Sequence, residues 1–257
     1  MGQSLKGQPP SVLLLRGKMN IKEQIKYSPR ESWQFFNQIS GSYDLLNHVL
    51  SFGMDSFWRK AFCRHVPEGQ VTLLDLATGT GDVLLTLLEK CPQIKKAHGI
   101  DLAENMLAIA QKKTQSRELM IPVEFKIADA QELPFTDQSM DVVTMAFGIR
   151  NVENPILVLK EIYRVLKPEG KAMILEFSLP SNFLLKVLDV VYLRSVVPLL
   201  GGLVSGNFAA YRYLNKTIEK FPYGERFCRM LEQVGLKDAR AIPLFGGVAS
   251  IYLAEKV

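Results

Sequence analysis

Short apolar runs alternate with stretches of helical spacing through the middle of the chain. The apolar runs are bounded by turn residues and predict strands at 71–77, 96–101, 123–129, 140–147 and 171–178. Apolar residues at helical spacing predict the intervening helices, at 81–91, 104–113 and 156–167, the last closed by Pro168 and Gly170. Because parallel neighbouring strands need a crossover connection, this alternation predicts a mostly parallel sheet with helices on both faces.

Two helical regions and a hairpin complete the pattern. Residues 30–66 are aromatic-rich and helical in spacing, and residues 181–235 form a second helical stretch after the fifth strand. The segments 236–245 and 248–257 are separated by Gly246-Gly247, which is typical of an antiparallel hairpin. We therefore expect a doubly wound α/β fold with a mostly parallel seven-stranded sheet, a helical N-terminal cover at 30–66 and a helical insert at 181–222.

We expect one domain, at 26–257, preceded by a flexible arm at 1–25. The arm holds one short apolar run, Val12 to Leu15, which is too short for a secretory signal peptide. The most apolar region, Phe183 to Val204, is interrupted by Lys186, Asp189, Arg194 and Pro198. Because a membrane-spanning helix needs about 20 apolar residues in succession, no transmembrane helix is predicted.

Composition places the chain among ordinary globular proteins. Of its 257 residues, 47% are hydrophobic and 22% are charged, which excludes the disordered and disulfide-scaffold classes. The net charge of +5 suits RNA, a phospholipid surface or a basic cytosolic protein, and alone decides nothing. Cys63, Cys91 and Cys228 have no CxxC spacing, so we expect a reducing compartment and neither a disulfide framework nor a zinc knuckle.

The turn after the first predicted strand carries closely spaced glycines. In DLATGTGD, at 75–82, Gly79 and Gly81 precede a helix. Glycine lets backbone N–H groups approach a ligand closely, and the helix contributes its positive end. The dinucleotide fingerprint GxGxxG would need a third glycine where Leu84 stands, so the turn alone leaves both a ligand site and a plain helix entry open.

Acidic residues accompany successive strands at the same edge of the sheet. Asp101 ends the second strand, 20 residues past Gly81, where a carboxylate can accept both hydroxyls of a ribose. Asp129 ends the third strand and adds an acceptor for the amino group of an adenine, and Asp75 lies in the first strand. Because ligands bind beyond the carboxyl ends of parallel strands, the pattern predicts an adenosine-containing ligand.

These features and four further motifs carry a resemblance to a known family. The order of the strand-end residues resembles that of the class I S-adenosylmethionine-dependent methyltransferases, which implies a Rossmann-like fold. The motifs similar to those of the quinone-biosynthesis C-methyltransferases, whose members make menaquinone and ubiquinone, are YDLLNHVLSFGMDSFWRK (43–60), FGIRN (147–151), RVLKPEGKAMILEFS (164–178) and AYRYLNKTIEKFP (210–222). The resemblance covers residues 30–257.

The resemblance implies S-adenosyl-L-methionine as the methyl donor. The binding residues that it implies are Thr80 and the backbone of Gly79 and Gly81 for the methionine part, Asp101 for the ribose, and Asp129 with the Ala130 backbone for the adenine. The chain departs from the family pattern at Asp55-Ser56, where a His–Arg pair is common, and at Ala146, Glu169 and Tyr252, where Ser, Gly and His are found in other members. The departures concern side chains around the site rather than the fold.

The chemistry that the resemblance implies asks mainly for positioning. Methyl transfer is an in-line displacement, and a quinol carbon becomes nucleophilic when an adjacent hydroxyl, of pKa about 10, loses its proton. Arg150 follows the fourth strand and would lower that pKa by its charge, and Asn151 would orient the ring or a water. The alternative for Arg150 is a salt bridge that holds its loop. Tyr43, Asp44 and Asn47 are expected in the cover over the cofactor, with core packing or helix capping as the alternative.

No metal is predicted. His48, His65 and His98 show no HxxH or HExxH spacing, so a structural or exposed position is expected for each. The cysteines lack a partnered histidine, which argues against nucleophilic thiol chemistry.

The apolar insert at 181–222 is expected to determine the substrate. Apolar side chains on more than one of its faces would line a channel for a polyprenyl tail and let the enzyme touch a bilayer. The expected partners are a polyprenyl quinol and, through peripheral contact, the inner face of the membrane from a cytoplasmic location, but not a nucleic acid. The sequence leaves a homodimer open.

The leading interpretation is an enzyme that converts a demethylmenaquinol to menaquinol. C-methylation of a 2-methoxy-6-polyprenyl-benzoquinol in ubiquinone biosynthesis is the first alternative, because the family serves both pathways. An RNA methyltransferase is the second, although the chain lacks an Asn/Asp-Pro-Pro-Tyr run and a clustered basic stripe with interleaved aromatics. A nucleotide-binding module without catalysis is the third, and Arg150-Asn151 argues against it.

Overall fold

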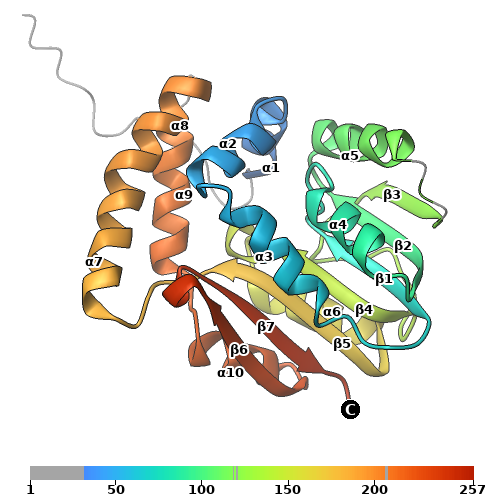
Figure 1. The fold of residues 1–257 in the computed structure, drawn as a ribbon. Coiled ribbons are helices and arrows are strands. Elements are labelled where there is room, and N and C mark those ends of the chain that lie inside the picture. The colour runs from blue at the N-terminus through green and yellow to red at the C-terminus, as the bar shows by residue number, and fades with distance from the viewer. Residues whose placement is uncertain (1–31, 118, 120, 206–207) are drawn as a thin grey trace, which may run out of the picture.

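The computed structural model describes residues 32–117, 119, 121–205 and 208–257, so the expected arm at 1–25 lies outside the described residues. The strands form one seven-stranded sheet in the order β3-β2-β1-β4-β5-β7-β6 (Figure 1). Their bounds are β1 (Val71–Leu76), β2 (Ile94–Asp101), β3 (Val123–Ile127), β4 (Met140–Ala146), β5 (Leu166–Phe177), β6 (Lys237–Leu244) and β7 (Ala249–Glu255).

The sheet is mostly parallel, as predicted. Strands β1 to β5 pair in parallel, whereas β7 pairs antiparallel with both β5 and β6 and closes the sheet as a hairpin. Parallel strands are covered on both faces, so their sequences are nearly continuous apolar runs. In β1, the run VTLLDL is buried at every position except Thr72. The predicted doubly wound α/β class is confirmed.

Helices occupy both faces of the sheet and its two flanks. Their bounds are α1 (Ser32–Ile39), α2 (Tyr43–Leu50), α3 (Met54–Cys63), α4 (Asp82–Lys90), α5 (Glu104–Ser116), α6 (Pro155–Val165), α7 (Phe183–Val191), α8 (Val197–Ser205), α9 (Phe208–Lys220) and α10 (Glu225–Gln233). A π-helix, Tyr192–Val196, joins α7 to α8, and short 3-10 helices lie at Ile149–Asn151 and Phe245–Gly247. No described helix is long and apolar enough to cross a membrane.

The sheet separates the hydrophobic core into two clusters, one on each face. On one face, α6 and α10 contribute buried residues such as Ile162 and Phe227, which pack on β4, β5 and β7. On the other face, α3 and α4 contribute residues such as Phe62 and Leu84. Alternate residues of each strand enter the two clusters because successive side chains of a strand point to opposite faces.

A third apolar cluster joins the N-terminal cover, α1 to α3, to the insert, α7 to α9. Phe35 and Leu46 from the cover pack with Leu193 and Tyr211 from the insert. Figure 1 shows the insert helices beside the sheet and the blue cover helices between the insert and α5. This cluster therefore ties α1 and α2 to the insert, whereas α3 packs on the sheet itself.

Two predicted strand boundaries, besides the start of β2 at Ile94 rather than at residue 96, are wrong. We expected the helix after the fourth strand to reach residue 167 and the fifth strand to begin at residue 171, but α6 ends at Val165 and β5 begins at Leu166. Leu166 pairs with Met140, and Lys167 precedes Pro168, which disfavours helical backbone for the preceding residue. At the other boundary, β3 ends at Ile127, so Asp129 lies in the following loop.

Candidate active site

Two adjoining cavities open at the carboxyl ends of the parallel strands. The smaller, here called the polar cleft, encloses about 270 Å³ and includes Asp101, Asp129, Ala130 and Asn151 in its lining. The larger, here called the apolar cavity, encloses about 420 Å³ and lies beneath the cover and the insert. The residues that line both are Phe36, Tyr43, Ala77, Gly79, Ala146 and Phe147. A ligand in the polar cleft would therefore adjoin a ligand in the apolar cavity.

Asp101 is held firmly at the wall of the polar cleft. Its Oδ2 atom accepts a hydrogen bond of 2.8 Å from the backbone N–H of Gly79, and its Oδ1 atom accepts one of 2.8 Å from Ala103. Burial raises the pKa of Asp101, and these backbone N–H groups oppose the rise because they favour the charged form. Each carboxylate oxygen retains capacity for another hydrogen bond, which suits the paired hydroxyls of a ribose.

The far end of the polar cleft fits an adenine. The Oδ1 atom of Asp129 accepts a hydrogen bond of 2.8 Å from the N–H of Gln131, which fixes the carboxylate, and the adjacent Ala130 is buried. Leu102 and Met106 add apolar lining. A flat base between apolar side chains, with an acceptor at its edge, matches this composition.

The glycine turn contributes to the two cavities unequally. Gly79 lines both cavities, and Thr80 lines the apolar cavity, where its hydroxyl donates a hydrogen bond of 2.5 Å to Asp44 Oδ1 of the cover. Gly81 lines neither cavity. It has a φ of +84°, and a Cβ atom there would lie 2.9 Å from the Cβ of Ala110. Gly81 therefore serves the close packing of α4 against α5.

Asp75 is separated from the other two acids. It is buried in β1, faces the apolar cavity and accepts a hydrogen bond of 2.6 Å from the hydroxyl of Thr144 on β4. Burial raises its pKa to about 7. The strand-end acids thus lie at one edge of the sheet, as predicted, but only Asp101 and Asp129 share the polar cleft.

Arg150 lines the apolar cavity with its charge already paired. Its Nη1 atom lies 2.5 Å from Oε1 of Glu176 on β5 and donates a hydrogen bond of 2.7 Å to the carbonyl of Phe147. Its guanidinium carbon lies 5.0 Å from the centroid of the Phe177 ring, and its side chain is 4% exposed. The structure therefore contains the salt bridge, Arg150 to Glu176, that was the alternative interpretation for Arg150. The Nε atom is buried without a partner among the described residues.

Asn151 lies apart from Arg150. It lines the polar cleft rather than the apolar cavity, and its Nδ2 atom donates a hydrogen bond of 3.3 Å to the carbonyl of Phe147. The adjacent residues of the FGIRN motif therefore divide between the two cavities. This placement favours a role for Asn151 beside the nucleoside and not beside the acceptor ring.

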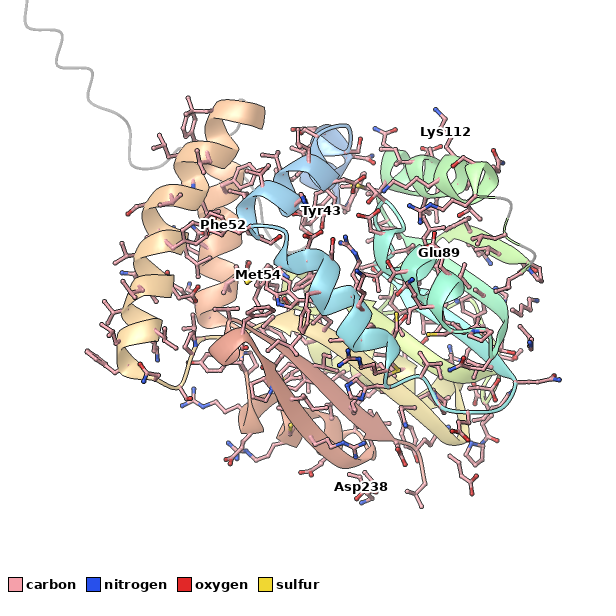
Figure 2. The ribbon with its side chains drawn as sticks, viewed as in Figure 1. Tyr43, Phe52, Met54, Glu89, Lys112 and Asp238 are labelled. Atoms are coloured by element: carbon pink, nitrogen blue, oxygen red, sulfur yellow. The ribbon has the colours of Figure 1, made fainter. Side chains whose placement is uncertain are left out.

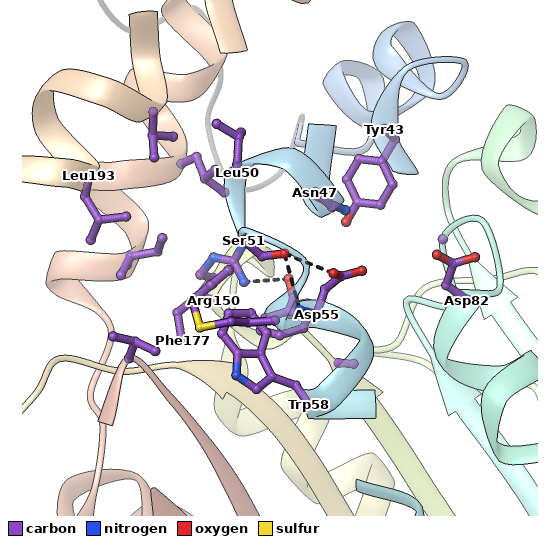
Figure 3. Close-up of a pocket in the computed structure, with 18 of the residues that line it drawn as sticks. Tyr43, Asn47, Leu50, Ser51, Asp55, Trp58, Asp82, Arg150, Phe177 and Leu193 are labelled. Atoms are coloured by element: carbon purple, nitrogen blue, oxygen red, sulfur yellow. Dashed lines mark hydrogen bonds between the residues drawn. The ribbon is translucent and has the colours of Figure 1, made fainter. Parts of the chain in front are cut away.

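Aromatic rings form the floor of the apolar cavity. The ring centroids of Phe147 and Phe177 lie 4.6 Å apart, and that of Trp58 lies 5.8 Å and 5.9 Å from them. Figure 3 shows Trp58, Phe177 and Arg150 together beneath the cover. Sequence reasoning missed this cluster, although an aromatic residue at the carboxyl end of β5 and another in the first motif were signals for it.

The cover brings polar residues to the upper wall of the apolar cavity. Figure 2 shows Tyr43, Phe52 and Met54 along the cover, between the insert and α4, and all three line the cavity. Tyr43 lies beside Asn47 (Figure 3). Burial raises the pKa of Tyr43, so the phenol stays protonated at neutral pH. Of the six described residues that line both cavities, Tyr43 is the one with a polar side chain.

Asp55, one of the departures from the resembled pattern, is fully engaged. It accepts a hydrogen bond of 3.0 Å from Ser51, forms an ion pair of 2.8 Å with Arg59 and lies 3.0 Å from His48 Nδ1. Although burial works to raise its pKa, Arg59, Ser51 and His48 together hold the pKa of Asp55 below its usual range. The carboxylate therefore stabilises the α2–α3 segment as a charged group.

The remaining histidines lie outside both linings. His98 Nδ1 lies 3.1 Å from Glu124 on β3, and burial lowers the pKa of His98. The part of the chain that the structure describes contains no group of three or more His, Cys, Asp and Glu residues that would hold a metal ion.

Comparison with known proteins gives relatives over nearly the whole chain. The profile of the ubiE/COQ5 methyltransferase family matches residues 21–256. The demethylmenaquinone methyltransferase of Thermus thermophilus is 43% identical over 222 residues, which cover 86% of this chain and 99% of that protein. The ubiquinone/menaquinone biosynthesis C-methyltransferase UbiE of Geotalea uraniireducens is 39% identical over 225 residues, 87% of this chain and 95% of that protein.

Solved structures agree in fold. An S-adenosylmethionine-dependent methyltransferase from Thermotoga maritima superposes with a TM-score of 0.63 at 20% identity, covering 88% of this chain and all of that one. At this identity the similarity concerns the fold alone. Together with the family profile and the relatives, however, it leaves one assignment. The chain belongs to the ubiE/COQ5 methyltransferase family.

Proposed function

We propose that the protein transfers the methyl group of S-adenosylmethionine to a ring carbon of a prenylated quinol, converting demethylmenaquinol to menaquinol. The observation that carries the proposal is a polar cleft, lined by Asp101 and Asp129, that adjoins a large apolar cavity at Gly79 and Tyr43. The names of the Thermus and Geotalea relatives support this acceptor class.

The residues of the polar cleft fit the donor. Asp101 would accept the ribose hydroxyls, and Asp129 with the Ala130 backbone would meet the adenine edge. Gly79 and Thr80, at the border of the apolar cavity, would hold the methionine part. The bound donor supplies an electrophilic methyl group on a positively charged sulfur. The position of the glycine turn would direct that end of the donor toward the apolar cavity.

The apolar cavity would orient the acceptor and exclude water. The rings of Trp58, Phe147 and Phe177 offer a stacking surface for the quinol ring. The unpaired Nε of Arg150 would donate to a quinol oxygen, which favours loss of the hydroxyl proton even though Glu176 balances the charge. Holding the donor and the acceptor carbon about 3–3.5 Å apart provides much of the rate in such displacements.

The ubiquinone-pathway acceptor remains the second candidate because the Geotalea relative is named for both pathways. A benzoquinol and a naphthoquinol share the hydroxyl, the ring and the prenyl tail that the apolar cavity would accommodate. An RNA nucleotide with its charged phosphate fits the apolar lining poorly.

The test is turnover with labelled S-adenosylmethionine and the purified protein. Reduced demethylmenaquinone and reduced demethyl-methoxy-benzoquinone are offered side by side, and the products are identified by mass. Methylation of the naphthoquinol alone supports the proposal, and methylation of both supports an enzyme of both pathways. Cofactor binding without methylation of either quinol contradicts the proposal.

We further propose that the insert contacts the cytoplasmic face of the membrane. Phe183, Leu184 and Leu203 are 80%, 66% and 67% exposed, and none of them lines the apolar cavity. Exposed apolar residues gathered on one flank are typical of an interaction surface, and a prenylated substrate dissolves in a bilayer. Liposome flotation tests this, with and without long-chain quinone and at several salt concentrations. The absence of flotation under all conditions contradicts membrane contact.

A further inference from the structure

Asp189 is an acidic residue on an otherwise apolar wall. It lies on α7, within the insert, and lines the apolar cavity together with Leu185, Leu188, Tyr192 and Leu193 of the same helical segment. In a helix, residues three and four positions apart lie on the same face, so these side chains form one stripe toward the cavity. Asp189 is the only charged member of this stripe.

The other acids on the cavity wall are already engaged. Asp44 bonds to Thr80 and Lys113, Asp82 pairs with Lys113, and Asp75 bonds to Thr144. Asp55 is held by Ser51, His48 and Arg59, as described above. For the carboxylate of Asp189, no hydrogen bond or ion pair is found with any of the residues that the structure describes. The half-buried carboxylate of Asp189 is therefore available to a ligand in the apolar cavity.

The turn that carries Asp189 is packed against the junction of α2 and α3. Tyr192, three residues further on, donates a hydrogen bond of 2.8 Å from its hydroxyl to the carbonyl of Leu50, and its ring centroid lies 5.5 Å from that of Phe52. Ser51, between them, bonds to Asp55. The π-helix begins at Tyr192, and such irregularities often occur at functional sites. Asp189 is therefore fixed to the same wall as the α2–α3 segment.

The environment of Asp189 gives it the acidity of a useful base. Burial raises its pKa to about 6, and no neighbouring charge contributes to the change. Asp189 in turn adds to the rise in the pKa of Tyr192. The other charged side chains on the cavity wall are Asp44, Asp55, Arg59, Asp75, Asp82 and Arg150, each with a partner within the chain. A base with a pKa near the working pH is ionised yet still able to take a proton.

The proposed reaction needs such a base. A quinol hydroxyl of pKa about 10 is almost wholly protonated at neutral pH. The charge of Arg150 is balanced by Glu176, and a guanidinium does not accept a proton. Tyr43 keeps its own proton because burial raises its pKa. Among the described residues that line the apolar cavity, a carboxylate without a partner is the remaining acceptor.

We propose that Asp189 accepts the hydrogen bond of the quinol hydroxyl and takes its proton as the ring carbon attacks. This inference rests on the proposed function. The hydroxyl proton moves to a carboxylate oxygen of Asp189. The ring carbon forms its new bond to the methyl carbon while the carbon–sulfur bond breaks, and that electron pair goes to sulfur. The displaced ring proton then leaves to water, and Asp189 returns its proton to the oxygen, so that the ring is again aromatic.

The test compares Asp189→Asn and Asp189→Glu with a control, Val187→Asn. Val187 lies on the same helix outside the cavity lining, so its variant places an equal amide beyond the site. Turnover is measured from pH 5 to 8 with a short-tailed demethylnaphthoquinol, which removes any effect of membrane contact. The affinity for S-adenosylmethionine is measured by calorimetry, and folding by thermal melting.

We expect kcat of Asp189→Asn to fall by about 100-fold or more at pH 7.5, the usual contribution of a positioned acid or base. The affinity for S-adenosylmethionine and the melting temperature should match those of Val187→Asn. The wild-type kcat should fall as the pH drops through about 6, where Asp189 becomes protonated, and Asp189→Asn should lack this decline. Asp189→Glu should restore part of the rate and the decline.

Two outcomes overturn the inference. The first is a wild-type kcat that is constant from pH 5 to 8. The second is an Asp189→Asn enzyme that keeps its kcat, whether or not its KM for the quinol rises. The wild-type measurement is independent of whether a variant folds. Failure of the proposed function is distinguishable, because the wild-type protein would then bind S-adenosylmethionine and methylate no quinol at any pH.

Discussion

The polar cleft and the apolar cavity adjoin each other but are constructed differently. The polar cleft is formed mainly by residues at or just after the ends of β1, β2, β3 and β4, and its acid Asp101 is held by backbone N–H groups of Gly79 and Ala103. The apolar cavity is enclosed by the cover and the insert, which are distant in sequence, and most of its charged groups have partners within the chain. The first therefore presents polar groups ready for a ligand, whereas the second selects mainly by apolar burial.

The largest expected effect is a loss of stability when the buried pair of Arg150 and Glu176, beside the floor of the apolar cavity, is broken. Arg150→Met leaves Glu176 buried and charged, which costs about 3–5 kcal/mol when one partner of a buried pair is removed. For a chain of this size the melting temperature should fall by about 10 °C. Thermal unfolding measures the change.

The matched control is the double variant Arg150→Met with Glu176→Gln. Removing both charges should restore most of the stability without restoring turnover, since the donor at the cavity wall is still absent. If Arg150→Met melts within 1 °C of the wild type, the pair does not hold the floor of the cavity, and the contrast with the polar cleft is lost.

The next effect is confined to the polar cleft. Asp101→Ala removes the acceptor proposed for both ribose hydroxyls, and two hydrogen bonds to a charged group at about 1.5 kcal/mol each correspond to about 100-fold in affinity. Calorimetry should show this loss for S-adenosylmethionine, while a short-tailed naphthoquinol binds as before. Equal weakening of both ligands would show that the two cavities are not separable.

The same contrast explains what was predictable from the sequence. Asp101 ends β2 and Asp129 lies two residues past β3, so the parallel pairing of these two strands brings them to one edge. The partner of Arg150 was not predicted, because it depends on the pairing of β4 with β5. A signal was present, however, since Glu176 interrupts the apolar run of β5 and a charged residue in a buried strand needs a partner.

The apolar cavity was less predictable for a related reason. Its walls come from segments that meet only through tertiary packing, such as Leu46 of α2 against Leu193 of the insert. Hydrophobic spacing identifies which residues are buried but not which helix covers which. For the same reason, sequence reasoning placed Arg150 and Asn151 at one site, whereas the short 3-10 helix directs them into different cavities.

A smaller effect separates two glycines of one turn. Gly81→Ala meets the Cβ of Ala110 at 2.9 Å and requires a φ of +84°, so it should lose about 1–3 kcal/mol of stability with little change in cofactor affinity. Gly79→Ala also requires a positive φ, +59°, but its Cβ meets no atom closer than 4.0 Å, so it lacks the steric part of the loss in stability. Its affinity for S-adenosylmethionine should fall about tenfold, the equivalent of one hydrogen bond. Melting and calorimetry of both variants measure the separation, and identical effects would contradict it.

The smallest expected effect comes from a substitution outside both cavities, which serves as a reference for the variants within them. Glu169, where the family usually has glycine, adopts a φ of +65° in β5, while its N–H donates to the carbonyl of Lys256. Left-handed backbone costs a residue with a side chain about 1–2 kcal/mol, and replacement by glycine removes this cost. Part of the gain in stability, about 0.5–1 kcal/mol, is lost again because glycine has greater conformational freedom in the unfolded chain. Glu169→Gly should therefore raise the melting temperature by about 1–4 °C. Because Glu169 lines neither cavity, affinity for both ligands should stay unchanged, and a change in either would mean that effects on stability and on binding are coupled across the sheet.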